Sequence, residues 1–589
     1  MQQSRDPYVL QVTAAFVVAG LFLFGASFND PFHFDDVLIT NDSNVTNPAR
    51  WSHFLNPFHL RQLTFFTFYL NHLVGGDDPA GYHIVNVTLH IANAVLLFVL
   101  LRRVVDRWIA VAAASVFLVH PIQTEPVLYV YQRSVLLACL FSLLALIALA
   151  ERRHWLAAAC FFCAFESKES AVAVPLAVAV LVNTVTANDA DGPRGRHLFL
   201  QPIRAIRGWL LAPYRIVLLA GSAVLSVGAI ALLFYRGEAT VGIGAAAQVS
   251  PGQYFLAQTR IVYTYLRLLV FPYPQSLEYE FPGPVGIVPL LGIVGMILSG
   301  WWLARRRESR IPGLCILSFF ALLAPTSSIV PSADAAFEHR LYLPMLAFSL
   351  LACYLISKLP RRTWIGIAVL CVLGVMTLRR GTVWSSDVAL WEDTVQHAPG
   401  KARVWFNLGG AYLKSEPDKA RSALLRALEL KPDFTEALYD LGVVEQGKEN
   451  WNMAVAYYQR AVETDALYWP AWNNMGNTLF AMGQHARALD SFQETLRLNH
   501  DYWPAQYNVA IVHFISGRYE EALPRLRSVL DWRPDFREAR YLLALTLTRA
   551  GDQTAADEQW KRLAEFAATE SRNTPAMILA PFDYKRRSR

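Results

Sequence analysis

Two adjacent carboxylates, Asp35 and Asp36, follow the first long apolar stretch of the chain. A carboxylate at the mouth of a membrane-embedded cavity can take a proton from a hydroxyl group, and such general-base catalysis is worth roughly 10²–10⁴-fold in rate. Aspartate also favours turns and helix caps, so a purely structural role is the alternative. The pair therefore indicates hydroxyl chemistry close to a membrane.

Further ionisable residues stand at the ends of later apolar stretches: His120, Glu125, Arg133, Lys168, Glu169, Arg236, Glu338, His339 and Arg340. By their spacing, His83, Asn86 and His90 share one face of a single helix. Charged groups at membrane depth are costly unless they pair or line a cavity. Convergence of these groups on one side of the bilayer predicts one charged cavity, and interfacial loops with structural ion pairs are the alternative.

Eleven membrane-spanning helices are predicted to carry these groups. They lie near residues 8–28, 82–101, 108–120, 134–150, 154–166, 169–185, 214–235, 284–304, 311–330, 342–358 and 363–379. With a cytoplasmic N-terminus, every arginine-rich cluster between them falls in the cytoplasm. Residues 253–271 carry Arg260 and Arg267 at helical spacing, which favours a helix in the interface over a crossing. The first stretch is expected to stay as an anchor, since further spans follow it.

The last part of the chain repeats every 34 residues. Ala420, Ala454, Ala488 and Ala522 keep this period, and so do several glycines. A period of 34 with a small residue in each helix is typical of tetratricopeptide repeats, which stack into a solenoid with a concave face. About five units are predicted, on the outer side of the membrane.

Asn407, Asn474 and Asn508 occupy one equivalent position of these repeats. Each amide has a donor and an acceptor, so a ladder of them can hydrogen-bond an extended peptide without reading its sequence. Asparagine is also simply common at this position of such repeats, which is the alternative. The sequence thus predicts an all-α protein with a multi-span membrane domain (1–380), a linker helix (381–402), a repeat domain (403–570) and a tail (571–589).

Composition excludes several other classes. Charged residues make up only 17% of the 589 residues, and the net charge of +6 is spread over short clusters, so no nucleic-acid partner is expected. The six cysteines lie in apolar stretches, which favours buried thiols over a redox pair at Cys160 and Cys163. The sequence has no Walker loop, dinucleotide fingerprint or HExxH motif, which argues against an ATP-driven pump, a dehydrogenase and a zinc protease.

In these motifs the chain resembles the transmembrane, tetratricopeptide-containing O-mannosyltransferases and their bacterial relatives, whose membrane half has the GT-C fold. The matching segments are Phe34-Asp35-Asp36, Arg61-Gln-Leu-Thr, His83-x-x-Asn86-x-x-x-His90, His120-Pro-x-x-Thr-Glu125, Arg133, Lys168-Glu169, Pro325-Thr-Ser-Ser and Glu338-His-Arg340. The resemblance covers nearly the whole chain in order. Gln62 stands where the family usually has proline, and Gln132 where glycine commonly precedes the arginine.

The resemblance implies transfer of a sugar, with mannose favoured, from a polyprenyl- or dolichyl-phosphate donor to Ser or Thr of an exported polypeptide. Asp35 would be the general base, and Asp36 would position the loop or a cation. The donor phosphate would be held by Arg340, His339, Lys168 and Arg133. The cavity would be supported by Glu338, His83, His90, His120, Glu125, Glu169 and Arg61. No cofactor is certain, and a divalent metal cation is an open alternative.

Three function classes are compatible with these features. The first is the glycosyltransferase, in a bacterial inner membrane with periplasmic repeats or in the endoplasmic reticulum with luminal repeats. The second is a transporter of lipid-linked sugars, which would use the charged cavity without a base. The third is a membrane-anchored scaffold that recruits partners through its repeats.

Overall fold

The computed structural model describes residues 6–56, 61–175, 177, 250–280, 287–306, 308–327 and 336–569. Every element of these residues is helical, as predicted. The chain divides into two compact units, Met1–His397 and Ala398–Arg589. The predicted linker segment falls across this division, because the helix Asp387–His397 lies in the first unit.

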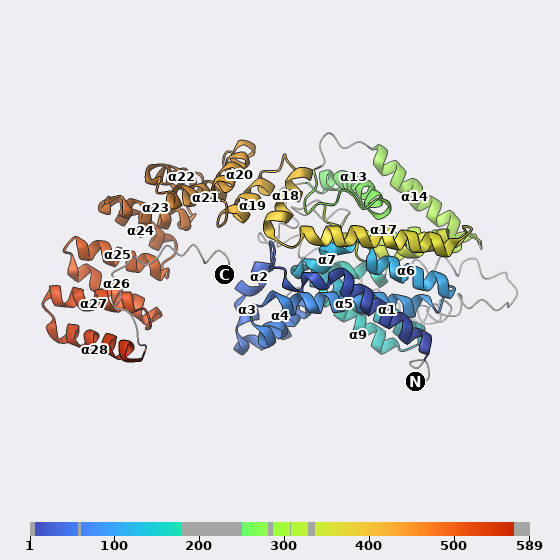
Figure 1. Ribbon diagram of the computed structural model, residues 1–589, viewed down its shortest axis with the longest axis horizontal. Helices are drawn as coiled ribbons and strands as arrows, with labels where there is room; N and C mark the ends of the chain where they lie inside the picture. The colour runs from blue at the N-terminus through green and yellow to red at the C-terminus, as the bar shows by residue number, and fades with distance from the viewer. Residues whose placement is uncertain are drawn as a thin grey trace. The chain divides into compact units, whose positions relative to one another are not determined.

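The first unit begins with α1 (Pro7–Phe24), η2 (Gly25–Asn29), α2 (Asp36–Asn41), α3 (Ser43–Thr46), η3 (Pro48–Leu55), α4 (Gln62–Gly75), α5 (Pro79–Leu101), α6 (Arg107–Val119), η4 (Pro121–Gln123) and α7 (Thr124–Leu128). It continues with η5 (Val130–Gln132), α8 (Arg133–Ala150), α9 (His154–Ser167), η6 (Glu169–Val172), α13 (Pro251–Val270), α14 (Val288–Arg305), α15 (Arg310–Leu323), η8 (Glu338–Leu341), α16 (Pro344–Ile356), α17 (Arg362–Val383) and α18 (Asp387–His397). Helices α1, α5, α6 and α17 pack side by side (Figure 1).

Local sequence signals set the starts of these helices. Asp6 and Asp78 each accept a hydrogen bond from the backbone N–H two residues on, and a proline follows each of them as the first helical residue. An N-cap acceptor satisfies a donor that the helix leaves open, and proline fits there because its missing N–H is not needed. Ser250 and Gln253 form a reciprocal capping box at α13.

Among the described residues, five helices are long and apolar enough to cross a membrane: Pro7–Asn29, Pro79–Leu101, Val130–Ala150, Val288–Arg305 and Arg362–Val383. A sixth is present if Arg107–Val119 and Pro121–Leu128, bent by 53°, form one span. These correspond to six of the predicted spans. The helix of residues 251–270 is not among them, in keeping with its two arginines.

The other predicted spans differ in outcome. Helices α9, α15 and α16 have 14, 14 and 13 residues, which is about 20 Å of helix, whereas the hydrocarbon core is about 30 Å thick. The predicted span 169–185 runs largely, and the span 214–235 wholly, outside the described residues, as does Arg236. A count of eleven crossings and the GT-C fold therefore stay predictions.

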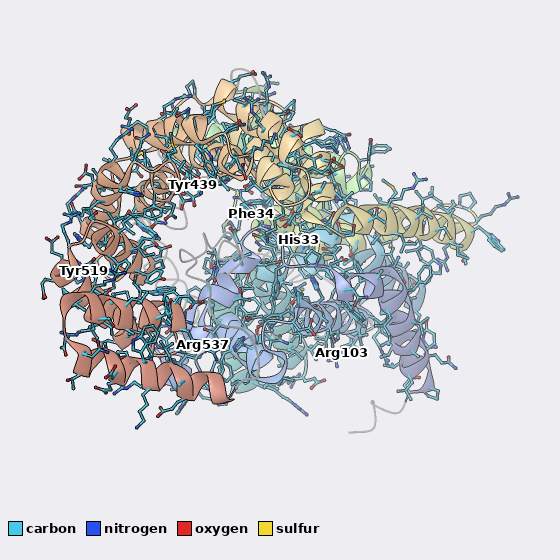
Figure 2. All side chains as sticks on the ribbon, turned by 60° about the vertical axis from the view of Figure 1, so that its left-hand side comes forward. His33, Phe34, Arg103, Tyr439, Tyr519 and Arg537 are labelled. Carbon is cyan, nitrogen blue, oxygen red and sulfur yellow. The ribbon has the colours of Figure 1, made fainter. Side chains whose placement is uncertain are left out.

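Polar contacts distinguish the two ends of the first unit. At one end, Arg102 pairs with Asp6 at 3.3 Å, and Arg103 pairs with Glu151 at 2.8 Å. The N-terminus of α1 and the C-terminus of α5 therefore lie together. The acid pair follows the opposite terminus of α1, so it lies at the far end of this bundle. Figure 2 labels Arg103 near the first end and His33 and Phe34 near the second.

The described residues of the second unit, which end at Thr569, form five helix pairs. They are α19 (Ala402–Tyr412) with α20 (Pro417–Leu430), α21 (Thr435–Gly447) with α22 (Trp451–Thr464), α23 (Trp469–Ala481) with α24 (His485–Leu498), α25 (Trp503–Ile515) with α26 (Tyr519–Trp532), and α27 (Arg537–Ala550) with α28 (Gln553–Thr569). The pairs follow one another along an arc, on which Tyr439, Tyr519 and Arg537 mark successive positions (Figure 2).

Glycine allows the closest contacts within these pairs. A Cβ atom at Gly442 would lie 2.4 Å from the ring of Tyr458, and one at Gly476 would lie 2.6 Å from the ring of Phe492. Both distances are below van der Waals contact, so the facing helices can pack this closely only because glycine has no side chain. Packing thus explains these two glycines, whereas Gly483, Gly517 and Gly551 have positive φ angles of 74°, 74° and 90° and nothing close to their Cβ positions.

Candidate active site

Asp36 is fixed inside the protein. Its side chain is fully buried and accepts hydrogen bonds from the backbone N–H groups of His33 (3.0 Å), Val130 (3.3 Å) and Tyr131 (2.6 Å). Burial raises the pKa of Asp36 to about 7, against the lowering effect of these N–H donors and of the His33 charge. With its oxygens engaged in this way, Asp36 ties the loop before α2 to the segment between α7 and α8.

Asp35 is half-buried and has a different partner. The hydroxyl of Tyr129 donates to Oδ2 of Asp35 at 2.8 Å, and the backbone N–H of Asp35 lies 3.3 Å from the same hydroxyl. Tyr129 is itself buried and stacks on Trp384 with ring centroids 6.0 Å apart. Tyr129 was not singled out from the sequence, because it lies 94 residues from Asp35 in a short apolar segment.

An ion pair supports the next part of the site. Arg61 precedes α4 in the left-handed region, at φ 61°, and its guanidinium donates twice to Glu169, at 3.0 and 2.7 Å. Burial alone would raise the pKa of Glu169, but Arg61 outweighs burial and lowers that pKa to about 2. The neighbouring Lys168 is buried, and its Nζ donates to Oε1 of Gln132 at 3.2 Å.

The surroundings of Lys168 keep its pKa low. Burial, reinforced by the positive charges of Arg61 and Arg340, lowers the pKa of Lys168 to about 7, against the effects of Glu169 and Glu125. Lys168 and the four residues whose charges act on it therefore form one charged cluster. Tyr131 connects this cluster to the acid pair, since its phenol is influenced by Arg61, Asp35 and Glu169.

Glu125 organises the segment Glu338–Arg340. It accepts a hydrogen bond from the backbone N–H of Glu338 at 2.9 Å and from Nδ1 of His339 at 2.6 Å. Glu338 in turn accepts from Gln275 Nε2 at 2.6 Å and from the hydroxyl of Tyr279. Burial and the charges of nearby cations lower the pKa of His339 well below its ordinary value.

Arg340 is held in the same region by α13 and α15. Its Nη1 donates to the hydroxyl of Tyr254 at 3.2 Å and to the backbone oxygen of Thr326 at 3.0 Å. A pocket is lined by Lys168, Ser170, Thr326, His339 and Arg340 on its polar side and by Val135, Leu322 and Leu343 on its apolar side. Three of the four predicted phosphate-binding residues therefore share one pocket.

The fourth, Arg133, lies among helices. It is fully buried and donates to Asn86 Oδ1 (2.8 Å), to Thr67 (3.2 and 3.3 Å) and to the backbone oxygen of Tyr82 (3.1 Å). Its guanidinium also lies 4.5 Å from the centre of the Phe68 ring. These partners come from α4 and α5, so Arg133 joins these two helices to the start of α8.

The predicted supporting histidines are also internal. His90 is fully buried between the hydroxyl of Tyr342 (2.8 Å) and the backbone oxygen of Leu118 (3.1 Å). His120 contacts the backbone oxygen of Leu269 at 3.1 Å, and His83 is fully buried on the same helix as His90. None of the three lines the pocket of Lys168, His339 and Arg340.

The asparagine ladder of the repeats is largely engaged in packing contacts. Asn474 is 3% exposed and donates to the hydroxyl of Tyr439 at 2.6 Å. Asn508 is equally buried and donates to Asn477 Oδ1 at 2.8 Å, while its own Oδ1 is left without a partner. Asn407 is half-buried, and its Nδ2 has no hydrogen-bond partner.

The residues around the acid pair do not fit a resident metal ion. In the part of the chain that the structure describes, no group of three or more His, Cys, Asp or Glu side chains could hold one. The oxygens of Asp36 accept hydrogen bonds from backbone N–H groups, whereas a divalent cation needs several converging oxygen ligands.

Comparison with known families defines the class of the second unit. Tetratricopeptide repeat models match residues 469–502 and residues 414–471 and 510–570. The repeats predicted from the 34-residue period are thus confirmed. Among solved structures, YrrB, described as "a TPR protein with an unusual peptide-binding site", is 20% identical with a TM-score of 0.29, covering 30% of this chain and 92% of its own.

Similarity to particular proteins extends over both units. The chain is 22% identical over 460 residues to the protein O-mannosyl-transferase TMTC3 of Mus musculus, covering 68% of this chain and 47% of that protein. It is 26% identical over 518 residues to TMTC1 of Homo sapiens, covering 73% of this chain and 56% of that protein. The predicted resemblance to these transferases is confirmed, and the chain spans about half the length of the curated relatives it matches.

Proposed function

We propose that this chain is an integral-membrane protein O-mannosyltransferase. The proposed donor is mannose on a polyprenyl or dolichyl phosphate, and the proposed acceptor is a Ser or Thr hydroxyl of an exported polypeptide held by the repeats. The observation that carries the proposal is the pocket in which Lys168, His339 and Arg340 meet apolar side chains. A lipid phosphate presents the same combination of a negative charge and an apolar chain. The names of the relatives agree with this reaction.

In the proposed reaction, Asp35 takes the proton from the acceptor hydroxyl. The hydroxyl oxygen then bonds to C1 of the sugar, and the bond between C1 and the phosphate oxygen breaks. The lipid phosphate leaves with the electron pair of that bond. Arg340 and Lys168 stabilise the leaving anion, so no acid catalyst is needed. Bound phosphate would also offset the positive charges that lower the pKa of Lys168 and of His339.

Other residues of the site have positioning roles in this proposal. The hydroxyl of Tyr129 orients the carboxylate of Asp35, and Asp36 holds the loop. Arg61 and Glu169 support Lys168, and Arg133 fixes the helices behind it. The repeats would lie outside the cytoplasm, where exported polypeptides are accessible.

The proposal is tested by incubating the purified chain with labelled lipid-phosphate mannose and a Ser/Thr-rich peptide. The incubation is done with and without a chelator. Asp35→Asn should reduce peptide labelling by about 10²–10⁴-fold, the usual contribution of a general base. The matched control is Asp77→Asn, a carboxylate whose side chain is 62% exposed in the loop before α5, which should keep full activity. Equal activity of wild type and Asp35→Asn would refute the role of Asp35.

A transporter of lipid-linked sugars would behave differently in the same variant. Without a chemical step, Asp35→Asn would leave translocation of the lipid across liposomes unchanged, and no labelled peptide would form with any variant. Measuring both products in one preparation therefore separates the transferase from the transporter.

A further inference from the structure

His33 occupies an unusual position beside the acid pair. Its side chain is fully buried, although it belongs to the loop between η2 and α2. Nδ1 lies 2.7 Å from Oδ1 of Asp387, and Nε2 lies 2.5 Å from the backbone oxygen of Trp384. Both partners belong to the junction between α17 and α18, more than 350 residues away in sequence.

The chemistry of these two contacts determines the protonation of His33. A backbone carbonyl can only accept a hydrogen bond, and an ionised carboxylate can only accept one. The side chain of Asp387 is 47% exposed, so water reaches the carboxylate that faces Nδ1. Both ring nitrogens of His33 must therefore donate, which requires the imidazolium form. Burial lowers the pKa of His33, but Asp387 and Asp36 outweigh burial and raise it.

Aromatic contacts reinforce the attachment. Trp384 meets the ring of His33 at 5.8 Å and stacks on Tyr129, the partner of Asp35. Phe34 packs edge-on against Trp391 of α18 at 5.7 Å. The α17–α18 junction therefore contacts the loop of the acid pair and also the residue that orients Asp35.

We propose that His33, as an imidazolium, is a positioning residue that fastens the loop of Asp35 and Asp36 to the α17–α18 junction. The activity readout of this inference rests on the proposed transferase function. The titratable groups that face His33 are Asp30 and Asp36 on its own loop, His83 on α5 and Asp387 on α18. Three of these four are carboxyls, which favours the charged ring.

Kinetics of the full chain with His33→Gln and Asp387→Asn test the inference. A loop shifted by about 1 Å costs on the order of 10²-fold in rate, so kcat should fall by about that factor. The KM for the lipid donor should change little, because the donor pocket has other residues. The matched control is His500→Gln, which removes an exposed histidine–aspartate pair of the repeats (3.0 Å) and should leave kcat unchanged.

The dependence of kcat on pH is a measurement that a merely structural role of His33 would not change. Because the pKa of His33 is raised above its ordinary value, the wild-type kcat should be maintained below that raised pKa and fall as pH rises through it. His33→Gln has no proton to lose there, so this alkaline limb should disappear. An unchanged alkaline limb in His33→Gln would contradict the inference.

A double-mutant cycle in thermal unfolding tests the attachment without activity. His33→Gln, Asp387→Asn and their combination should be non-additive, since either single change already removes the charged pair. Additive shifts in unfolding temperature would overturn the inference. If the wild type transfers no mannose, the proposed function fails, while the cycle still decides whether His33 and Asp387 are coupled.

Discussion

At the scale of single residues, two neighbouring carboxyls have different surroundings. Asp36 is enclosed by backbone N–H donors, whereas Asp35 is half-buried beside a tyrosine hydroxyl. The sequence predicted an acid pair, but it could not assign the two environments. These environments depend on Tyr129, Val130 and Tyr131, which reach the pair only through the packing of α7 and α8 against the loop.

Asp36→Asn should destabilise the protein, although the two side chains are almost equal in size. An asparagine presents an amide NH₂ to donors that now share a carboxylate, so at least one buried N–H loses its acceptor. Such a loss costs about 1–3 kcal/mol. Thermal unfolding in detergent should show a lower midpoint than that of Asp77→Asn, and equal midpoints would mean that the buried contacts contribute nothing.

Binding of the lipid phosphate should depend on pH through Lys168. The pKa of Lys168 is about 7 without ligand, and a bound phosphate favours the protonated amine. Affinity should therefore be highest below pH 7 and fall as pH rises above it, by at most about tenfold per unit for one coupled proton. Titration of fluorescent polyprenyl phosphate measures this, and Lys168→Met should bind weakly with a flatter profile.

At the scale of elements, hydropathy predicted the positions of the helices better than it predicted their lengths. The predicted spans 311–330 and 342–358 are apolar, yet the helices found there have only 14 and 13 residues. A hydropathy window counts apolar residues whether or not they continue one helix. The turn after Leu323, near Pro325, is an example. Six predicted spans nevertheless coincide with helices of sufficient length and apolarity.

Arg133→Met should show how far one side chain holds three helices together. The substitution removes hydrogen bonds to Asn86, Thr67 and Tyr82 and leaves their oxygens buried. Hydrogen bonds to charged groups contribute about 1.5–3 kcal/mol each, so the midpoint of thermal unfolding should fall clearly below that of Arg50→Met, an exposed arginine of the same unit. A direct role in phosphate binding would instead appear as weaker lipid binding at an unchanged midpoint.

At the scale of the whole molecule, the 34-residue period predicted the helix pairs of the second unit well. Repeats are local in sequence, so their pattern carries most of their structure. The charged cavity depends on contacts over long separations, such as Arg61 with Glu169 and Glu125 with His339. Its residue types were visible in the sequence, but the separation of the acid loop from the pocket of Lys168, His339 and Arg340 was not.

Tethered repeats should favour long acceptors over short ones. In the proposed function, the covalent attachment of the repeats raises the local concentration of a bound polypeptide to roughly the millimolar range. Asn407→Ala should raise the KM for a long Ser/Thr-rich polypeptide and leave kcat/KM for a tripeptide unchanged, since only the longer chain can occupy both units. Equal effects on both acceptors would place Asn407 outside acceptor binding. Thermal unfolding verifies that the array stays folded.

The contact between His33 and Asp387 also restricts the path of the chain through a bilayer. His33 follows α1, and Asp387 follows α17, so the C-termini of these two helices lie at the same end of the bundle. If α1 crosses once, the number of crossings from the first residue through α17 must be odd. Under that condition, the contact is compatible with the predicted eleven crossings and not with an even number. It also means that α18 begins at the end of the bundle where the acid pair lies.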